Sequence, residues 1–502
     1  MKRPNVLFII TDQHNARCMG VAGHPDVKTP NLDKLAHEGV YFRNTFVQNP
    51  VCTPSRISFL TGQYTHVHGT YSIFNRCRPE LYGMHHFLKE NGYQVAAVGK
   101  QHIDDRWFCH QLDFWAAEIQ DHTKYLNAAP RIADYVAYLR ALGLEDLDDS
   151  VILPEDRNSR DNRPKGFQPL DGRASKMPLE HSLEYFTANQ AIHYLKNVRD
   201  KSRPFFLWLG YHRPHEIYTP SEPYASMYSP ESLHLPPHSI EEFNNKPPRQ
   251  QEYAKLCYDE NSPLYIFGRG GETGLRRVVS NYLGLVSQVD DSIGKVISYL
   301  QEIGELDNTI VIYTSDHGDY AGEHGLLEKK CGISYDAITR VPLIIRYPEK
   351  IKAGKVVNSL VESIDVFKTV AKLAGLEPPT TIQGKSLLPY FEEDYDEEIR
   401  DAVFTENNWT KVIRTKEWKL VHYPGVDYGE LYNLKEDPWE LNNLFNNPEY
   451  REIVEILRHK LLDWYIKSER PVTYFCNSYE ESFPDRDGRA KKPITDINYY
   501  YA

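Results

Sequence analysis

Four short, uninterrupted apolar runs restrict the possible folds of this chain more than any other feature of its sequence. They lie at residues 6–10, 94–98, 205–209 and 309–313. Continuous rather than alternating apolar character is typical of strands buried on both faces, as in a parallel sheet covered by helices. Helical patterns separate the runs, at residues 31–38, 81–91 and 279–303. We therefore predict an α/β fold with a large, mostly parallel central sheet between layers of helices.

Ionisable side chains follow each of the four runs. In chain order they are Asp12, Gln13 and His14, then Lys100 and His102, then His212 and His215, and finally Asp316 and His317. In open α/β sheets, ligands bind beyond the carboxyl ends of the strands. Side chains far apart in the sequence are therefore predicted to meet at one edge of the sheet, which makes that edge the predicted active site.

A change of pattern near residue 392 predicts a second structural unit. An acidic stretch begins there, and short segments of β character follow at residues 402–406, 410–415 and 418–423, before a helical pattern at 448–466. This order is typical of a small antiparallel sheet with one helix. We predict a catalytic α/β domain at residues 1–392 and a C-terminal α+β subdomain with a tail at residues 393–502.

Residues 105–180 form an irregular, charged insertion within the first domain. The stretch contains Arg163, Lys165, Arg173 and Lys176. Loops that lie over a site often select the substrate. We predict that Arg163 and Arg173 bind substrate. The alternative is that this insertion is a solvated surface segment, which would have the same composition.

Composition excludes several classes of protein. A net charge of −12 over 502 residues argues against a nucleic-acid-binding protein, so an anion site must be a local basic pocket. The seven cysteines are scattered and form no CxxC pair, which argues against a disulfide framework or a zinc site. No apolar run approaches the length of a membrane span. We expect a cytoplasmic protein if Met1 is the native start, and a secreted or periplasmic one if a signal peptide was removed.

The polar residues after the first and fourth runs predict a metal site. Asp12, Gln13, Asp316 and His317 supply mainly oxygen ligands, which suit Ca²⁺ or Mg²⁺ better than zinc. The imidazole of His317 is also compatible with Mn²⁺. Of these ions, Ca²⁺ is the predicted one. Alternatively, the two aspartates only cap the helices that follow their strands.

The run Cys52-Thr53-Pro54-Ser55-Arg56, followed by Leu60-Thr61-Gly62, resembles the signature of type I sulfatases in the alkaline phosphatase superfamily. Residues 5–12 and 315–319 resemble the opening strand and second metal motif of that family, and 430–438 its C-terminal segment. The resemblance implies an alkaline-phosphatase-like fold. It also implies that a maturation enzyme oxidises Cys52 to formylglycine, which also binds the metal. The alternative is an ordinary cysteine before a helix with an early proline.

Formylglycine has a chemical advantage over serine in this reaction. A serine that attacked a sulfate ester would become a sulfated serine, which hydrolyses slowly. A hydrated aldehyde carries two oxygens on one carbon, so one attacks sulfur and deprotonation of the other expels sulfate. The nucleophile therefore regenerates itself.

The resemblance also assigns roles to residues around Cys52. It implies that Asp316 accepts the proton of the attacking hydroxyl, while Arg56 and Lys100 hold the formylglycine hydroxyls. His102 then takes the proton that triggers the loss of sulfate. Gly99-Lys100-Gln101-His102 matches the Lys-x-His element of the family.

A second set of residues is implied to hold the sulfate. His215 matches the Pro-His element and would contact sulfate and the leaving oxygen. Counting from His324 selects Lys329 as the lysine that neutralises sulfate and protonates the leaving group. Lys330 is the fallback, and His212 is a further substrate-binding candidate.

The predicted function is hydrolysis of a sulfate monoester, with a sulfated carbohydrate as the substrate. Many sulfatases have Asp-Asp and Asp-Asn where this chain has Asp12-Gln13 and Asp316-His317. The Gln and His versions occur in a branch with bacterial carbohydrate sulfatases, choline sulfatase-like enzymes and phosphonate monoester hydrolases. A phosphonate monoester or phosphodiester hydrolase with the same aldehyde is therefore the alternative, and an inactive sulfoglycan-binding protein is a third.

Overall fold

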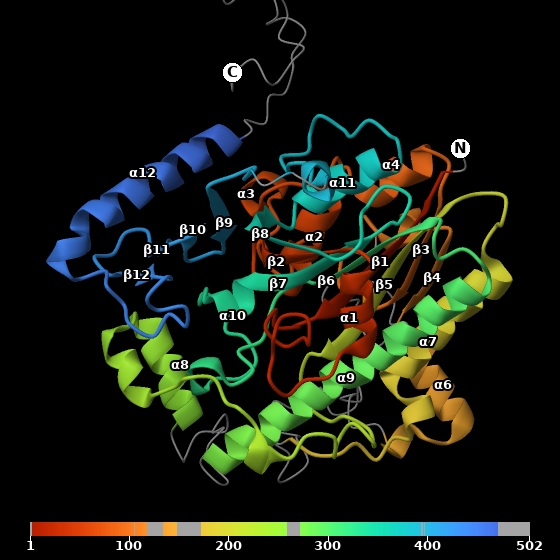
Figure 1. The fold of residues 1–502 in the computed structure, drawn as a ribbon, viewed down its shortest axis with the longest axis horizontal. Helices are drawn as coiled ribbons and strands as arrows, with labels where there is room; N and C mark the ends of the chain where they lie inside the picture. Colours follow the sequence, from red (N-terminus) through yellow and green to blue (C-terminus); the bar gives the residue numbers. More distant parts are fainter. Residues whose placement is uncertain are drawn as a thin grey trace, which may run out of the picture.

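The computed structural model describes residues 3–104, 106–117, 134–147, 172–258, 272–392, 395 and 397–469. Its main element is an eight-stranded sheet with the strand order β4-β3-β5-β1-β6-β7-β2-β8 (Figure 1). The strands are β1 (Asn5–Asp12), β2 (Val40–Phe46), β3 (Gln94–Gly99), β4 (Phe114–Ala117), β5 (Phe205–Pro214), β6 (Thr309–Ser315), β7 (Arg340–Arg346) and β8 (Lys355–Glu362).

The four apolar runs form the adjacent parallel strands β3, β5, β1 and β6. Every residue of β1 is buried, because β5 and β6 pair with its two edges and helices cover its two faces. Among the eight strands of this sheet, β7 runs antiparallel to its neighbours β6 and β2. The prediction of a mostly parallel sheet is therefore confirmed.

Two layers of helices cover the sheet. On one face, α2, α4 and α11 pack on Val6, Phe8 and Ile10, and on the other α1, α7 and α9 pack on Leu7 and Ile9. The helices are α1 (Pro30–His37), α2 (Cys52–Thr61), α3 (Thr65–His68), α4 (Met84–Glu90), α6 (Asp134–Leu142), α7 (Leu183–His193), α8 (Pro248–Tyr258), α9 (Glu272–Glu302), α10 (Asp336–Thr339), α11 (Asp365–Leu373) and α12 (Arg451–Ser468).

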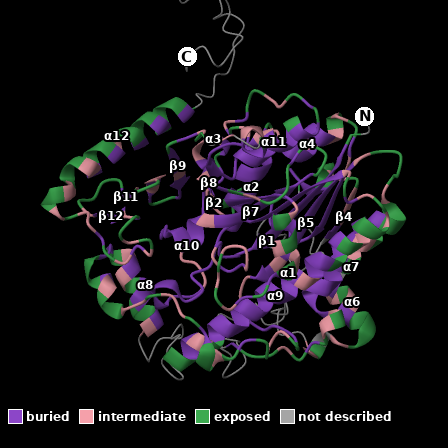
Figure 2. Ribbon diagram, in the orientation of Figure 1, coloured by how far each residue is buried: buried purple, intermediate pink, exposed green. Residues whose placement is uncertain are grey.

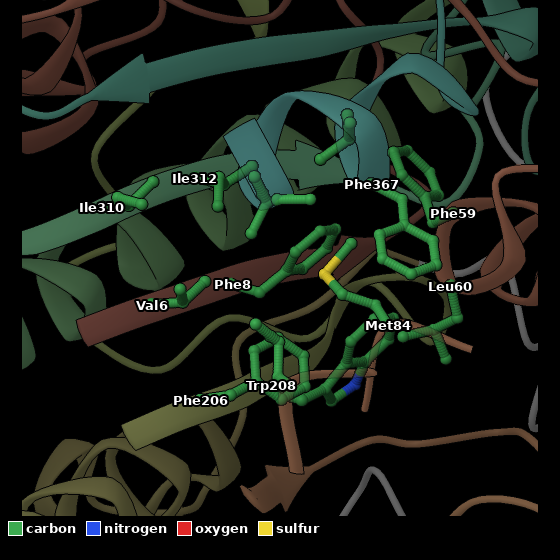
Figure 3. Packing of buried hydrophobic residues seen from close by; sticks show 14 of the residues in the cluster. Val6, Phe8, Phe59, Leu60, Met84, Phe206, Trp208, Ile310, Ile312 and Phe367 are labelled. Carbon is green, nitrogen blue, oxygen red and sulfur yellow. The ribbon is translucent and has the colours of Figure 1, made fainter. Parts of the chain in front are cut away.

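Aromatic packing fixes α2 against the sheet. The ring of Phe8 stacks on Trp208 of β5, with centroids 5.0 Å apart, and meets Phe59 of α2 edge to face at 5.8 Å. Figure 3 shows these rings together with Met84 and Phe367 in one apolar layer. The sheet and α2 are buried along most of their length (Figure 2). A helix held in this way is a rigid support for its first residue, Cys52.

The second sheet is antiparallel, with the order β12-β11-β10-β9. Its strands are β9 (Ala402–Glu406), β10 (Lys411–Thr415), β11 (Trp418–His422) and β12 (Gly429–Asn433). It lies with α12 to one side of the large sheet (Figure 1). The small antiparallel sheet with one helix is confirmed, and β12 is an additional strand that the sequence pattern did not indicate. The domain boundary at residue 392 stays a prediction. Tyr64 and Ile364, which lie before it, belong to the same apolar cluster as residues of the second sheet and α12.

The 105–180 insertion is less irregular than the sequence suggested. It contributes β4 to the edge of the large sheet, and it contains α6. Residues 118–133 and 148–171 lie outside the described part of the chain. Among the described helices, none is both long and apolar enough to cross a membrane.

A buried carboxylate, Glu406 at the end of β9, links the second sheet to α3. His66 donates to its Oε1 from the backbone N at 2.8 Å, with the ring Nδ1 at 2.7 Å. Tyr71 and Lys411 donate to Oε2. Burial alone would raise the pKa of Glu406, but His66 and Lys411 outweigh it and lower the pKa to about 2.

We expect Glu406→Gln to lower the free energy of unfolding by about 3 kcal/mol at neutral pH, because His66 and the partly exposed Lys411 lose the buried carboxylate that they contact. The pKa of the folded carboxyl lies below the ordinary 4.5, so its contribution is complete above about pH 4.5 and disappears as the pH falls toward 2. Urea unfolding of both proteins across this range measures the difference. A difference that does not change with pH would contradict the assignment.

Candidate active site

The carboxyl ends of four parallel strands place polar side chains at one edge of the large sheet. Asp12 ends β1, and Lys100, Asp316 and His215 follow β3, β6 and β5. The side chains meet there: Lys100 Nζ lies 2.5 Å from Asp12 Oδ2, and His215 Nε2 lies 4.0 Å from Asp12 Oδ1.

Helix α2 brings Cys52 to the same edge. Cys52 is its first residue, after Val51 in an extended conformation, and all ten residues of the helix are buried. Pro54 fits the first turn, where a backbone N–H has no helical acceptor. The Cys52 Sγ lies 3.3 Å from His317 Nε2 and 3.8 Å from Asp12 Oδ1.

Asp12, Cys52, Asp316 and His317 form a compact buried group. Their ligand atoms all lie within 4.8 Å of one another. The Nδ1 of His317 faces the carbonyl oxygen of Gly318 at 3.0 Å, so Nε2 is free to ligate toward the group. Burial lowers the pKa of His317, which favours the neutral, ligating imidazole. Two carboxylates and a neutral imidazole fit a divalent cation.

Arg56 and Lys100 compensate the two buried carboxylates. Arg56 Nε donates to Asp316 Oδ2 at 2.8 Å, and its Nη2 donates to Asp12 Oδ2 at 3.2 Å. Burial alone would raise the pKa of Asp12, but Lys100, followed by His215, His317 and Arg56, holds it well below its usual range.

The cations leave one oxygen of each carboxylate facing the group of four. Oδ1 of Asp12 lies 3.5 Å from His317 Nε2, and Oδ1 of Asp316 lies 3.6 Å from the same nitrogen. Each aspartate can therefore contact a cationic side chain and a metal at the same time.

Lys329 lies at the site, and Lys330 does not. Lys329 Nζ donates to Gln13 Oε1 at 2.8 Å and lies 3.4 Å from His215 Nε2. Lys330 Nζ instead lies 5.3 Å from the ring centroid of Tyr253. Burial lowers the pKa of His215 to about 4, so its imidazole is neutral at pH 7.

The backbone and the side chain of Gln13 have different partners. Its backbone N donates to Asp316 Oδ1 at 3.2 Å. Its side-chain Nε2 donates to Asp319 Oδ2 at 2.7 Å and to Glu216 Oε2 at 2.9 Å. Its Oε1 accepts from Lys329, and its predicted role as a metal ligand stays a prediction.

The two remaining histidines occupy different positions. The carbonyl oxygen of His102 accepts from Thr53 Oγ1 at 2.8 Å, which attaches the loop after β3 to the start of α2. His212 lies within β5, with its ring centroid 5.1 Å from that of His215. Its Nδ1 is buried without a hydrogen-bond partner among the described residues, and burial lowers its pKa well below the usual value.

The two arginines of the insertion remain predictions. Arg163 lies outside the described residues. Arg173 is exposed, on a segment that runs beside the chain following His215, where Ser175 N donates to Pro220 O at 2.8 Å.

The sequence did not assign roles to three acidic residues beside the lysine and histidine: Glu216, Asp319 and Glu328. Burial raises the pKa of Asp319 to about 7 and that of Glu328 well above its usual value. Glu216 directly follows His215, and Glu328 directly precedes Lys329. The sequence did contain a signal for Glu216 and Glu328, since each lies next to a predicted sulfate-binding residue.

Comparison with known families decides the assignment. The model described as Sulfatase matches residues 4–376, and the one described as N-sulphoglucosamine sulphohydrolase, C-terminal, matches residues 322–467. The chain belongs to the sulfatase family. It is therefore a sulfuric ester hydrolase by family, with an alkaline-phosphatase-like fold, and the family uses a divalent metal and formylglycine.

Two curated relatives match almost the whole chain. The N-acetylglucosamine-6-O-sulfatase of Bacteroides thetaiotaomicron is 27% identical over 91% of this chain and 86% of its own length. The multifunctional alkaline phosphatase superfamily protein PehA of Trinickia caryophylli is 31% identical over 95% of this chain and 98% of its own length.

Two solved structures also match most of the chain. The phosphonate monoester hydrolase of Agrobacterium radiobacter has a TM-score of 0.77 at 26% identity, over 93% of this chain and 96% of that one. BT4656 in complex with its substrate D-glucosamine-2-N,6-O-disulfate has a TM-score of 0.69 at 25% identity, over 93% of this chain and 98% of that one.

We expect Arg56→Met to destabilise this sulfatase by about 3–5 kcal/mol, because removing one partner leaves two buried carboxylates uncompensated. A bound divalent cation also compensates the charge of these two carboxylates, so added Ca²⁺ should raise the melting temperature of the variant more than that of the wild type. Thermal unfolding with EDTA and with Ca²⁺ tests this. Equal shifts in both proteins would contradict the expected compensation.

Proposed function

We propose that this protein hydrolyses sulfate monoesters of a sulfated carbohydrate, with residue 52 as formylglycine and Ca²⁺ held by Asp12, Cys52, Asp316 and His317. The observation that carries the proposal is the placement of Lys329 and His215 next to this group of four. A sulfate bound between them would meet the nucleophile on one side and proton donors on the other, which is the arrangement that transfer of a sulfuryl group requires.

The donor set supports a hard divalent cation. Each aspartate directs one oxygen toward the group, and oxygen-rich sites favour Ca²⁺ or Mg²⁺, while the imidazole also accepts Mn²⁺. When bound, the ion polarises a sulfate oxygen and stabilises negative charge in the transition state. Of these ions, Ca²⁺ is the one that we propose.

The environment of Cys52 supports its modification. Burial, followed by the charge of Asp12, raises the pKa of the thiol to about 12. The thiolate is the reactive form of cysteine, so an unmodified Cys52 would be a weak nucleophile at neutral pH. A formylglycine-installing enzyme is the maturation partner that this proposal requires.

We assign roles to the remaining side chains according to their charge. Arg56 contacts both aspartates, and Lys100 contacts Asp12, so these cations compensate the charge of the carboxylates. We propose that Asp316 accepts the proton of the attacking hydroxyl and that His102 accepts the proton released on loss of sulfate. Lys329 stays protonated because anionic neighbours, Glu216 and Asp12 among them, raise its pKa although burial lowers it, so it can donate to the leaving oxygen.

A carbohydrate substrate is supported by the relatives. An N-acetylglucosamine-6-O-sulfatase matches 91% of the chain, and the chain resembles BT4656, which was solved with a disulfated glucosamine. Arg163 and Arg173 remain the proposed contacts to such a substrate. A screen of sulfated saccharides would identify the sugar and the position of its sulfate.

A phosphonate monoester or phosphodiester hydrolase is the second candidate. The structural match to a phosphonate monoester hydrolase has the higher TM-score, 0.77 against 0.69, and Gln13 and His317 favour that branch. Both reactions need the same nucleophile, metal and cationic pocket. They differ in the charge and the central atom of the group that is transferred.

One experiment separates the candidates. The mass of the peptide that contains residue 52 first establishes the aldehyde. Three substrates with the same 4-nitrophenyl leaving group are then compared: a sulfate, a phenylphosphonate and a phosphodiester. Sulfated saccharides follow. We expect the highest kcat/KM with a sulfate. Phosphonate turnover far above sulfate turnover would reverse the order. Glycan binding without turnover by modified protein would indicate a sulfoglycan-binding role instead.

We expect Cys52→Ser to react once with an activated aryl sulfate and then stop, because a sulfated serine lacks the second hydroxyl that expels sulfate. Mass spectrometry of the peptide containing residue 52 should show the added sulfate, at up to one per protein. Continued multiple turnover by the variant would contradict the mechanism.

A further inference from the structure

A groove lies between the C-terminal unit and the helical layer of the large sheet. Helices α11 and α12, strand β9 and residues 378–385 border it (Figure 1). Its volume is about 780 Å³, within the range of roughly 300–1,000 Å³ that is typical of ligand sites. The residues that line it include none of those proposed for catalysis or metal binding.

The groove lies at the far end of α2 from the nucleophile. Cys52 is the first of the ten residues of α2, whereas Gly62 follows the last one. Gln383, which lines the groove, donates its backbone N to Gly62 O at 2.8 Å. A helix of this length spans about 15 Å, so a ligand in the groove does not occupy the position of the group that is cleaved.

Lysine side chains from three elements line the groove. They are Lys368 of α11, Lys385 of the segment after it, and Lys460 and Lys467 of α12. Lys460 Nζ donates to Asp401 Oδ2 and Lys385 Nζ to Ile399 O, both at 2.6 Å. Lys368 and Lys467 have no hydrogen-bond or ion-pair partner among the described residues. Two ammonium groups are therefore available to a ligand.

The environment of Lys368 favours a bound anion. The side chain is half-buried, and this burial, followed by the charge of Lys372, lowers its pKa. Asp365 offsets the shift in part, but its carboxylate is already paired with Arg400 at 2.7 Å. The ammonium group has thus lost part of its hydration without gaining a counter-ion of its own. A negatively charged ligand would supply one.

The groove also offers groups that suit a sugar ring. The indole of Trp464, which is 8% exposed, stacks on Phe404 with centroids 4.5 Å apart. Its Nε1 is buried and has no hydrogen-bond partner among the described residues. The carboxylates of Asp401 and Asp463 line the same groove and can accept from hydroxyl groups. Apolar surface, hydroxyl acceptors and cations therefore lie together.

From these features we propose that the groove is a second binding site for a sulfated saccharide, outside the active site. Lysine ammonium groups are compact point charges, and their separation suits sulfates that are spread along a chain. The two carboxylates disfavour a polymer with a charge on every unit, such as a nucleic acid, but they suit sugar hydroxyls. The preference for an anion rests on the groove alone, whereas the choice of a sulfated ligand rests on the proposed function.

The test measures binding of a trisulfated disaccharide to the full chain by isothermal titration calorimetry. Cys52→Ala prevents turnover, and Lys329→Met weakens binding in the active site, so the heat that remains belongs to the groove. Adding Lys368→Gln and Lys467→Gln should lower the affinity of this event about 10-fold, because both available ammonium groups are lost. Lys467→Gln alone, at an exposed position, provides the test if the double substitution does not fold.

A matched pair of substitutions removes the same charge elsewhere. Lys196 and Lys201 are exposed and do not line the groove, so Lys196→Gln with Lys201→Gln should leave the affinity unchanged. An equal loss of affinity in both pairs would overturn the proposal, since net charge alone would then explain it. Equal binding of the unsulfated disaccharide would also overturn it. Tighter binding of a polyglutamate peptide would assign the groove to an acidic protein segment instead.

A kinetic measurement separates this proposal from the proposed function. In the otherwise wild-type chain, Lys368→Gln with Lys467→Gln should leave kcat/KM for 4-nitrophenyl sulfate within about twofold, because the groove is distant from residue 52. A large loss of this activity would contradict a site outside the active site. If the wild type hydrolyses no sulfate ester, the proposed function fails while the titration still decides whether the groove binds the disaccharide.

Discussion

The centre of this molecule depends on one buried guanidinium. Arg56 lies fully buried between Asp12 and Asp316, and it is held by a helix that is itself buried along its whole length. Without a cation at this position, two carboxylates at the ends of adjacent strands would repel each other in a medium of low polarity. The guanidinium therefore allows the strand ends, the start of α2 and a metal site to occupy the same small volume.

This compensation also divides the site into two halves. The Oδ2 atoms of Asp12 and Asp316 contact Arg56, whereas their Oδ1 atoms face His317. On the other side, Glu216 and Asp319 orient Gln13 toward Lys329. Each cationic side chain is thus matched to anionic or neutral acceptors before a substrate arrives. A site organised in this way can receive an anion although the chain as a whole carries a net charge of −12.

Much of the fold follows from local sequence patterns, and so does part of the site. Strands buried on both faces must be apolar throughout, so β1, β3, β5 and β6 were recognisable from sequence. Their parallel arrangement placed Asp12, Lys100 and Asp316 at one edge. The pattern gave no indication of the reversed direction of β7 or of β12, because strand direction and short edge strands depend on pairing with distant segments.

The sequence by itself determined which residue types carry the chemistry and which edge of the sheet they occupy. Counting along the sequence selected Lys329, and the tertiary structure shows its Nζ beside Gln13 and His215 while that of Lys330 lies near Tyr253. Glu328, directly before Lys329, has a φ of 64°, a conformation that local sequence did not indicate. The tertiary structure also set the hydrogen-bond partners of the Gln13 amide, which are Lys329, Glu216 and Asp319. The physical reason is the same in both cases: the partners of a buried polar side chain come from segments hundreds of residues away, and satisfying them sets its direction.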